Sequence, residues 1–192
     1  MIHAITIKKK GILVMIYAFL ADGFEEIEAI TPVDILKRAG FEIKTVGVTG
    51  NIVTGAHKIP IKTDISLSEV DEKKAELLFL PGGMPGTTNL KNSKTLENII
   101  LNADKNGIYI AAICAAPMIL GELNLLNGKK ATCFPGFEEH LLGSTVCPDS
   151  VVSDKNIITA RGAGAAHKLG FKLVSLLKDQ DCADKLSEAM QY

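Results

Sequence analysis

Residues 109–117 read YIAAICAAP, and this stretch is the clearest indication of the fold class. Its first five residues form a continuous apolar run of strand length, which is typical of a buried strand. Cys114 and two small residues follow, and they open a helix that we expect over residues 115–123. A buried strand that leads directly into a helix is characteristic of parallel sheets with helices on both faces. This stretch therefore predicts an α/β fold.

The same alternation continues on both sides of this stretch. We expect strands at 12–20, 42–48, 77–80 and 108–113, weaker strands at 131–134, 151–152 and 157–159, and a short hairpin within 51–61. Helical periods predict helices at 24–39, 93–106, 115–123, 163–177 and 181–190. The chain is interpreted as one doubly wound α/β domain over residues 12–192, preceded by an N-terminal extension at 1–11. In such sheets ligands bind at the carboxyl ends of the strands.

The helix predicted at 24–39 contains a proline near its middle and is followed by a glycine. Pro32 lies inside it and predicts a kink or a restart, because proline has no backbone N–H to donate. Gly40 stands where a C-cap glycine is expected. The side expected to be buried comprises Ile27, Ile30, Ile35 and Leu36.

Composition excludes several function classes. The 192 residues have a formal net charge of −1 and a pI of about 6.4, so no surface that neutralises phosphates is expected and no nucleic-acid partner. The four cysteines are far apart and lack the spacing of a metal site, so we expect no metal. They are interpreted as reduced thiols of a cytoplasmic protein.

The N-terminus resembles a secretory signal only superficially. Lys8 to Lys10 precede the apolar run 12–21, but that run ends at a turn signal and is interpreted as the first strand. It is also too short to cross a membrane, and no other segment is long enough. A start at Met15 would make residues 1–14 a loosely held extension.

Cys114 is the first candidate for chemistry. Its position predicts a thiol on a tight turn at the carboxyl edge of the sheet, like the nucleophile elbow of hydrolases with sulfur in place of oxygen. The following helix N-terminus is expected to favour the thiolate and to lower the pKa of the thiol. The alternative is a buried, unreactive cysteine.

Two further segments are expected to lie beside the Cys114 thiol, namely the glycines at 82–83 and the start of the first predicted helix. Gly82 and Gly83 follow a buried strand, and their N–H groups can form an oxyanion nest or belong to a plain turn. Glu25 and Glu26 are interpreted as solvated partners of the helix dipole. Glu28 lies one turn further in, where burial would raise its pKa and let it donate a proton to a neighbouring thiolate.

Other motifs are weaker. Residues 161–167, RGAGAAH, contain half of a dinucleotide fingerprint, but the third glycine is missing, so no nucleotide cofactor is expected. His140 and His167 can fall near the strand ends, although surface or capping roles are more common for histidine.

Four ordered motifs together resemble the DJ-1/ThiJ/PfpI superfamily, in particular its DJ-1/ThiJ-like branch. They are LADGFEEIE at 20–28 with PVD at 32–34, LPGG at 80–83, AAICAAP at 111–117 and RGAG at 161–164. The resemblance covers about residues 12–190. It implies a flavodoxin-like sheet with helices on both faces, the class I glutamine amidotransferase-like fold, and a homodimer.

The resemblance also assigns roles. It implies that Cys114 is a nucleophilic, readily oxidised cysteine, that Glu28 is a protonated glutamate bonded to the sulfur, and that the amides of Gly83 and Ala115 form the oxyanion hole. Further positions expected around the pocket are Gly82, Cys133, Phe134 and Gly162.

The family's activities give the function. The resemblance implies action on small dicarbonyls such as methylglyoxal, or on glycated side chains, as a glutathione-independent glyoxalase or deglycase in oxidative-stress defence, without a cofactor. The alternative from another class is a non-enzymatic redox sensor or redox-regulated chaperone, in which Cys114 is oxidised to sulfinic acid.

Two departures from the family's patterns restrict these roles. PfpI-type proteases have a histidine directly after the cysteine, whereas Ala115 follows Cys114, so no peptidase pair is evident. Phe134 stands where animal DJ-1 proteins have a histidine, so base catalysis must rest on Glu28 or water. Cys133 is either a second redox thiol or, more simply, a core cysteine.

Overall fold

A computed structural model describes residues 8–9, 12–13 and 15–192. The predicted extension at 1–11 lies outside the described residues apart from β1 (Lys8–Lys9), which pairs antiparallel with β2 (Ile12–Leu13). The first strand of the main sheet is β3 (Met15–Leu20), so the predicted strand 12–20 is divided between β2 and β3.

In the described part of the chain, seven strands form the central sheet, in the order β12-β13-β9-β8-β3-β4-β7. All neighbours are parallel except the antiparallel pair β12 and β13 at one edge. The predicted doubly wound, mostly parallel sheet is thereby confirmed. The strands that join β3 are β4 (Ile43–Gly47), β7 (Ile65–Ser66), β8 (Ala75–Leu80), β9 (Tyr109–Ile113), β12 (Val151–Asp154) and β13 (Ile157–Ala160).

The strands are continuously apolar because both faces of the sheet are buried. In β3, Tyr17 and Phe19 pack into one core, while Ile16 and Ala18 pack into the core on the opposite face. Successive side chains of a strand point to opposite faces, so a strand that is covered on both sides shows no polar alternation.

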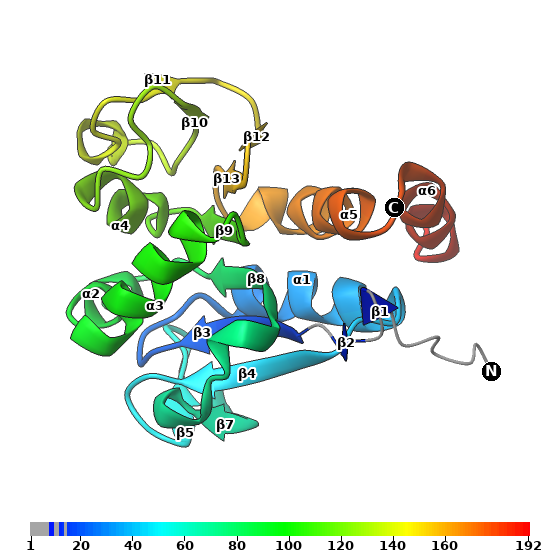
Figure 1. The fold of residues 1–192 in the computed structure, drawn as a ribbon, viewed down its shortest axis with the longest axis horizontal. Helices are drawn as coiled ribbons and strands as arrows, with labels where there is room; N and C mark the ends of the chain where they lie inside the picture. Colours follow the sequence, from blue (N-terminus) through cyan, green and yellow to red (C-terminus); the bar gives the residue numbers. More distant parts are fainter. Residues whose placement is uncertain (1–7, 10–11, 14) are drawn as a thin grey trace.

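Helices cover both faces, as expected. Figure 1 shows α1 beside α5, with α6 following at the end of α5, and these three helices contribute to one core. Residues of α2, α3 and α4 pack in the other core. The helices are α1 (Glu26–Arg38), α2 (Gly86–Lys91), α3 (Lys94–Lys105), α4 (Pro117–Glu122), α5 (Ala166–Leu177) and α6 (Gln180–Ala189).

Helix α1 differs from the prediction in two respects. It continues through Pro32 as one helix, so it does not restart there. Its buried stripe has the spacing 29, 32, 33 and 36, and the side chains of Ile27 and Ile30 lie outside it, 53% and 39% exposed. The expectation that Ile27 and Ile30 face the core was wrong, whereas Ile35 and Leu36 are fully buried.

Smaller elements connect the layers. The predicted hairpin is confirmed as β5 (Ile52–Thr54) with β6 (Pro60–Lys62), and β10 (Lys130–Ala131) pairs with β11 (Thr145–Val146) outside the main sheet. Short 3₁₀ helices occupy Leu67–Glu69, Glu72–Lys74, Glu138–His140 and Ala163–Ala165. No helix in the described part of the chain is both long and apolar enough to cross a bilayer.

Candidate active site

Cys114 stands directly after β9, at the carboxyl edge of the sheet. Its backbone is held from two sides, because its N–H donates to the Ala160 carbonyl at 2.9 Å and its own carbonyl accepts from Phe134 N–H at 2.8 Å. Its φ of 65° lies in the left-handed region, which residues with a side chain rarely adopt. The predicted tight turn is present, and α4 begins three residues later, at Pro117.

Glu28 reaches the thiol from the first turn of α1. Its side chain is buried, with 1% of the residue exposed, and forms a hydrogen bond with the Cys114 side chain. Gly82 N–H donates to Glu28 Oε2 at 3.1 Å, and the backbone N–H of Ala163 donates to the same carboxyl group. Elements from four parts of the chain therefore place Glu28 against Cys114.

Gly82 packs against both of these side chains, and its lack of a Cβ is essential. A Cβ at this position would lie 2.6 Å from both the Cys114 Cβ and Glu28 Oε2. Contacts this short force atoms apart, because carbon atoms in van der Waals contact are about 3.5–4.0 Å apart.

Gly82→Ala is therefore expected to move the thiol from the carboxyl group and to slow alkylation of Cys114 by iodoacetamide by about a hundredfold, as small misplacements of reacting groups do. The measurement is the alkylation rate at pH 8. Gly50→Ala is the matched control, since its Cβ would meet only the Ile52 carbonyl oxygen, at 3.7 Å. Equal rates for the two variants would contradict this role of Gly82.

The charges of the pair are coupled. Burial raises the pKa of Glu28 to about 7, although hydrogen bonds from Cys114, Gly82 and Ala163 oppose this shift. Burial, together with repulsion from the Glu28 carboxylate, raises the pKa of the Cys114 thiol to about 12. The expectation of a lowered thiol pKa was therefore wrong while Glu28 is ionised, because burial and the neighbouring carboxylate outweigh the backbone N–H groups at the helix start.

The two predicted oxyanion-hole amides do meet at the sulfur. The backbone N–H groups of Gly83 and Ala115 both form hydrogen bonds with Cys114 that favour its thiolate form. Gly83 has a φ of 90°, and a Cβ there would lie 2.4 Å from the backbone nitrogen of Glu25, so glycine is required at this position. Negative charge that develops at or next to the sulfur would thus face two donors.

A pocket of about 360 Å³ opens beside this pair, lined by Phe134, Pro135, Ser150, Arg161 and residues 162–165. Gly162 joins the pocket to the reactive pair, because a Cβ there would lie 3.1 Å from the Phe134 ring and 4.0 Å from Glu28 Oε1. Two of the expected pocket positions, Phe134 and Gly162, therefore do line it.

Cys133 lies elsewhere. It is 4% exposed, packs in the core on the α4 side of the sheet and does not line this pocket. Burial and the charge of Glu138 raise the pKa of its thiol to about 11. These surroundings are those of a structural cysteine.

His140 and His167, the two histidines that the sequence allowed near the strand ends, have other partners. His140 Nδ1 lies 3.3 Å from Glu122 Oε1, and the His167 ring stacks on Tyr192 with centroids 5.0 Å apart. Neither contributes to the pKa of Cys114, which depends on burial, on Glu28 and on two backbone amides. Glu28 is thus the titratable side chain positioned to exchange a proton with the thiol.

Sequence reasoning missed the environment of Glu26. Its side chain is buried and accepts hydrogen bonds from the His57 backbone N–H and Nδ1, both at 2.9 Å, so its interpretation as a solvated residue was wrong. The hairpin that carries His57 thereby closes over the start of α1. Glu25, Glu26 and His57 have ligand atoms within 4.8 Å of one another, but the bonds from His57 already explain Glu26, and we assign no metal to the group. No local signal connects residues 31 positions apart.

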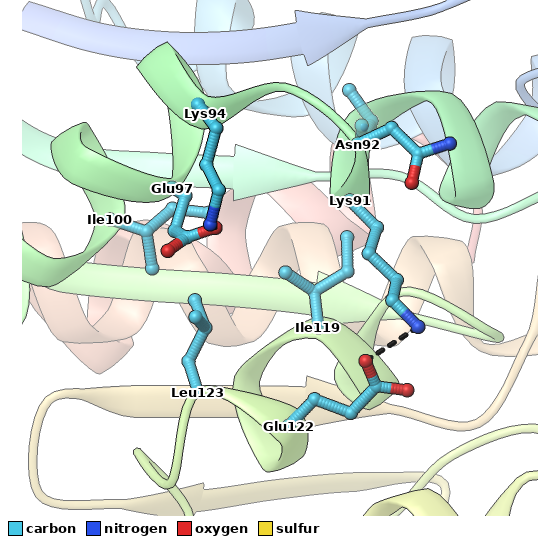
Figure 2. A pocket seen from close by; sticks show the side chains of 9 residues that line it. Lys91, Asn92, Lys94, Glu97, Ile100, Ile119, Glu122 and Leu123 are labelled. Atoms are coloured by element: carbon cyan, nitrogen blue, oxygen red, sulfur yellow. Dashed lines mark hydrogen bonds and ion pairs between the residues drawn. The ribbon is translucent and has the colours of Figure 1, made fainter.

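A second pocket of about 370 Å³ lies between α2, α3 and α4 (Figure 2). Its charged side chains pair with one another, Lys91 with Glu122 and Lys94 with Glu97, above an apolar floor that includes Ile100 and Ile119. Cys114 and Glu28 do not line it. Because its charges are balanced internally, it has no evident preference for a charged ligand.

Comparison with known proteins gives one consistent result. The DJ-1/PfpI family matches residues 14–176. Protein DJ-1 homolog A of Arabidopsis thaliana is 36% identical over 89% of this chain and 45% of its own length. A Pyrococcus abyssi protein named as a deglycase is 31% identical over 82% of this chain and 96% of its own. The solved structure of oxidized Toxoplasma gondii DJ-1 has a TM-score of 0.89 and 30% identity, covering 93% of this chain and 98% of that one.

The likeness to the Toxoplasma gondii structure confirms the flavodoxin-like α/β fold. This chain spans less than half the length of the Arabidopsis thaliana relatives that it matches.

Proposed function

Because the chain belongs to the DJ-1/PfpI family, we propose that it is a cysteine-dependent enzyme that converts small α-oxoaldehydes such as methylglyoxal into 2-hydroxy acids without glutathione. The observation that carries the proposal is the convergence of the Cys114 thiol, the buried Glu28 with its pKa near 7, and two backbone amides. A nucleophile, a base and an oxyanion site are what acyl chemistry on a carbonyl requires.

Addition to the aldehyde is the first step. The Glu28 carboxylate takes the thiol proton, and the sulfur forms a bond to the aldehyde carbon while the carbonyl electrons move to oxygen. The amides of Gly83 and Ala115 hold this oxygen, and the proton on Glu28 neutralises it to give a hemithioacetal. A pKa near 7 suits both directions of this transfer at neutral pH.

Isomerisation and hydrolysis follow. Glu28 takes the proton from the former aldehyde carbon while the ketone oxygen takes up a proton, which gives an enediol. The hydroxyl on the former aldehyde carbon then loses its proton, and Glu28 returns a proton to the neighbouring carbon, which gives a 2-hydroxyacyl thioester. The first carbon is oxidised and the second reduced by the same electron pair, so no external oxidant is needed. Water then cleaves the thioester, releases the 2-hydroxy acid and restores the thiol.

Glycated side chains are the second substrate class. An adduct of methylglyoxal with an amine or a thiol contains the same pair of carbons, and the same steps would release the side chain. The name of the Pyrococcus abyssi relative supports this extension.

The test is turnover. Protein with reduced Cys114 is incubated with excess methylglyoxal without glutathione, and lactate is measured against chain concentration. We expect many equivalents of lactate per chain. Consumption of no more than one equivalent, without lactate, would contradict the enzyme proposal.

That negative outcome would favour a redox sensor or redox-regulated chaperone. The Toxoplasma gondii DJ-1 structure, which is of an oxidized form, supports this second candidate. A Cys114 sulfinate would lie among the amides of Gly83 and Ala115 and the Glu28 acid, which together would stabilise its negative charge.

We also propose a cytoplasmic location, which the four free cysteines support because a reducing compartment keeps thiols in this form.

We also propose that the chain forms a homodimer through the outer side of α1. Four isoleucines there and on the adjoining hairpin are 39–65% exposed: Ile27, Ile30, Ile52 and Ile59. The hairpin is attached to α1 by the bonds between His57 and Glu26. Grouped exposed apolar side chains are typical of interaction surfaces.

The double variant Ile27→Asp/Ile30→Asp is expected to be monomeric at concentrations where the wild type is dimeric, because two carboxylates would have to be buried unpaired. Sedimentation velocity measures the change. Leu142→Asp, at a position 48% exposed on another part of the surface, is the control and should leave the dimer intact. A wild type that sediments as a monomer would contradict the proposal.

A further inference from the structure

Among the described residues that line the pocket beside Cys114, Arg161 is the one that carries a charge. Its neighbours there are the ring of Phe134, Pro135, Ser150 and the small residues 162–165. Among the described residues, no carboxylate forms an ion pair with its guanidinium. By contrast, Arg38, the other arginine of the chain, is paired with Asp34 at 2.6 Å.

The backbone of Arg161 is held close to the reactive pair, while the residue itself is exposed. Its backbone N–H donates to the Ser150 carbonyl at 3.0 Å, which holds the start of the 161–165 segment. The next two residues contact the reaction centre, since Gly162 abuts Glu28 and the Ala163 N–H donates to the Glu28 carboxyl group. Arg161 therefore directly precedes residues 162–163, which pack against Glu28, the proposed base.

An unpaired guanidinium beside an apolar surface is a recognition element for anions. Its planar donors match the two oxygens of a carboxylate, and the small residues around it leave room for a ligand. The pocket of about 360 Å³ is also much larger than a three-carbon aldehyde needs.

We propose that Arg161 is a specificity-determining residue that selects α-oxoaldehydes carrying an anionic group several carbons from the aldehyde. This inference rests on the proposed glyoxalase function. The aldehyde would lie at Cys114, the chain would pass over Gly162, and the anionic end would pair with Arg161. Such a substrate, R–CO–CHO with a carboxylate in R, takes up one water and gives the 2-hydroxy diacid and one proton.

The kinetic test compares 4,5-dioxopentanoate with its neutral methyl ester as substrates. The wild type is expected to favour the carboxylate in kcat/KM by about tenfold or more, since a charge-assisted hydrogen bond has this strength. Arg161→Gln should lose the preference and Arg161→Lys should retain part of it, because lysine keeps the charge but not the fork. Arg38→Gln, which removes the same charge from another surface, should keep the preference. Equal preference in the wild type and Arg161→Gln would overturn the inference.

A second measurement separates this inference from the proposed function. Cys114 is alkylated with iodoacetate, which is anionic, and with iodoacetamide, which is its neutral counterpart, and the ratio of the two rates is determined without any turnover. Arg161→Gln is expected to lower the ratio of iodoacetate to iodoacetamide rates by about tenfold, and Arg38→Gln to leave it unchanged. An unchanged ratio in Arg161→Gln would overturn the role of Arg161. If Arg161→Gln lowers the ratio but the wild type turns over neither 4,5-dioxopentanoate nor its methyl ester, the role of Arg161 in anion recognition would be supported and the glyoxalase function rejected.

Discussion

Replacing Cys114 with serine is expected to abolish lactate formation from methylglyoxal, with a loss of about 10⁴-fold or more in kcat/KM. The serine hydroxyl is a much weaker acid than a thiol. Its oxygen is also a weaker nucleophile than sulfur, so addition to the aldehyde with transfer of the hydroxyl proton to Glu28 is expected to be much slower than the same step at the Cys114 thiol. The measurement is the initial rate of lactate formation at pH 8 with excess substrate.

Cys147→Ser is the matched control. Cys147 is half-buried, and its Sγ lies 3.6 Å from the Thr145 carbonyl, a contact that a serine hydroxyl preserves. This variant should keep the wild-type rate, and both variants should retain the wild-type melting temperature. Lactate formation that survives in Cys114→Ser, with reduced protein, would contradict the assignment of the nucleophile.

Glu28→Gln is expected to lower kcat/KM by about 10²–10⁴-fold, because the amide keeps the shape of the side chain but cannot take up a proton. In the wild type, kcat/KM should rise as the pH increases through about 7, where Glu28 loses its proton and becomes able to accept one from the thiol. The variant should lack this rise. A wild-type rate in the variant, or a rise near pH 7 that survives in it, would contradict the assignment of Glu28 as the base.

Stability gives an independent measurement on the same residue. The pKa of Glu28 is raised above its ordinary value of 4.5, so its protonated form stabilises the fold below pH 4.5 and this stability is lost as the pH rises through about 7. The loss amounts to as much as about 3 kcal/mol. For Glu28→Gln, the free energy of unfolding is expected to differ less between pH 5 and pH 8 than it does for the wild type. The exposed Glu139→Gln should leave the wild-type difference unchanged.

The layered fold was largely predictable because the central strands are long enough to be recognised from their own residues, whereas β7, which has only two residues, was not predicted. Tyr109 to Ile113 are apolar throughout, since alternate side chains enter cores on opposite faces, and the short turn after them follows from small residues. Helix α1 shows the limit of this reasoning. Isoleucine is equally apolar on either side of a helix, so the sequence did not distinguish Ile27 and Ile30, which are exposed, from Ile35 and Leu36 in the core.

The residues of the candidate site that belong to sequence motifs were predictable. Contacts between segments that are distant in the sequence were not. Cys114, Glu28, Gly83 and Ala115 are brought together as expected. The raised thiol pKa was missed because it depends on burial and on the separation of Cys114 from Glu28, which no local spacing encodes. The bond between Glu26 and His57 joins a helix to a hairpin, and the pocket position of Arg161 depends on the 134–135 and 161–165 segments lying side by side.

The proposed activity requires the reduced Cys114 thiol as its nucleophile. The most direct measurement compares lactate formation from methylglyoxal by one preparation before and after peroxide oxidises Cys114 to sulfinic acid, with the oxidation state verified by peptide mass spectrometry. A sulfinate is a weaker nucleophile than a thiolate, and it cannot form the thioester that water hydrolyses to release the 2-hydroxy acid and restore the thiol. We expect many equivalents of lactate per reduced chain and none from the oxidised chain. Equal rates from the two forms, or no lactate from the reduced chain, would contradict the proposed role of Cys114.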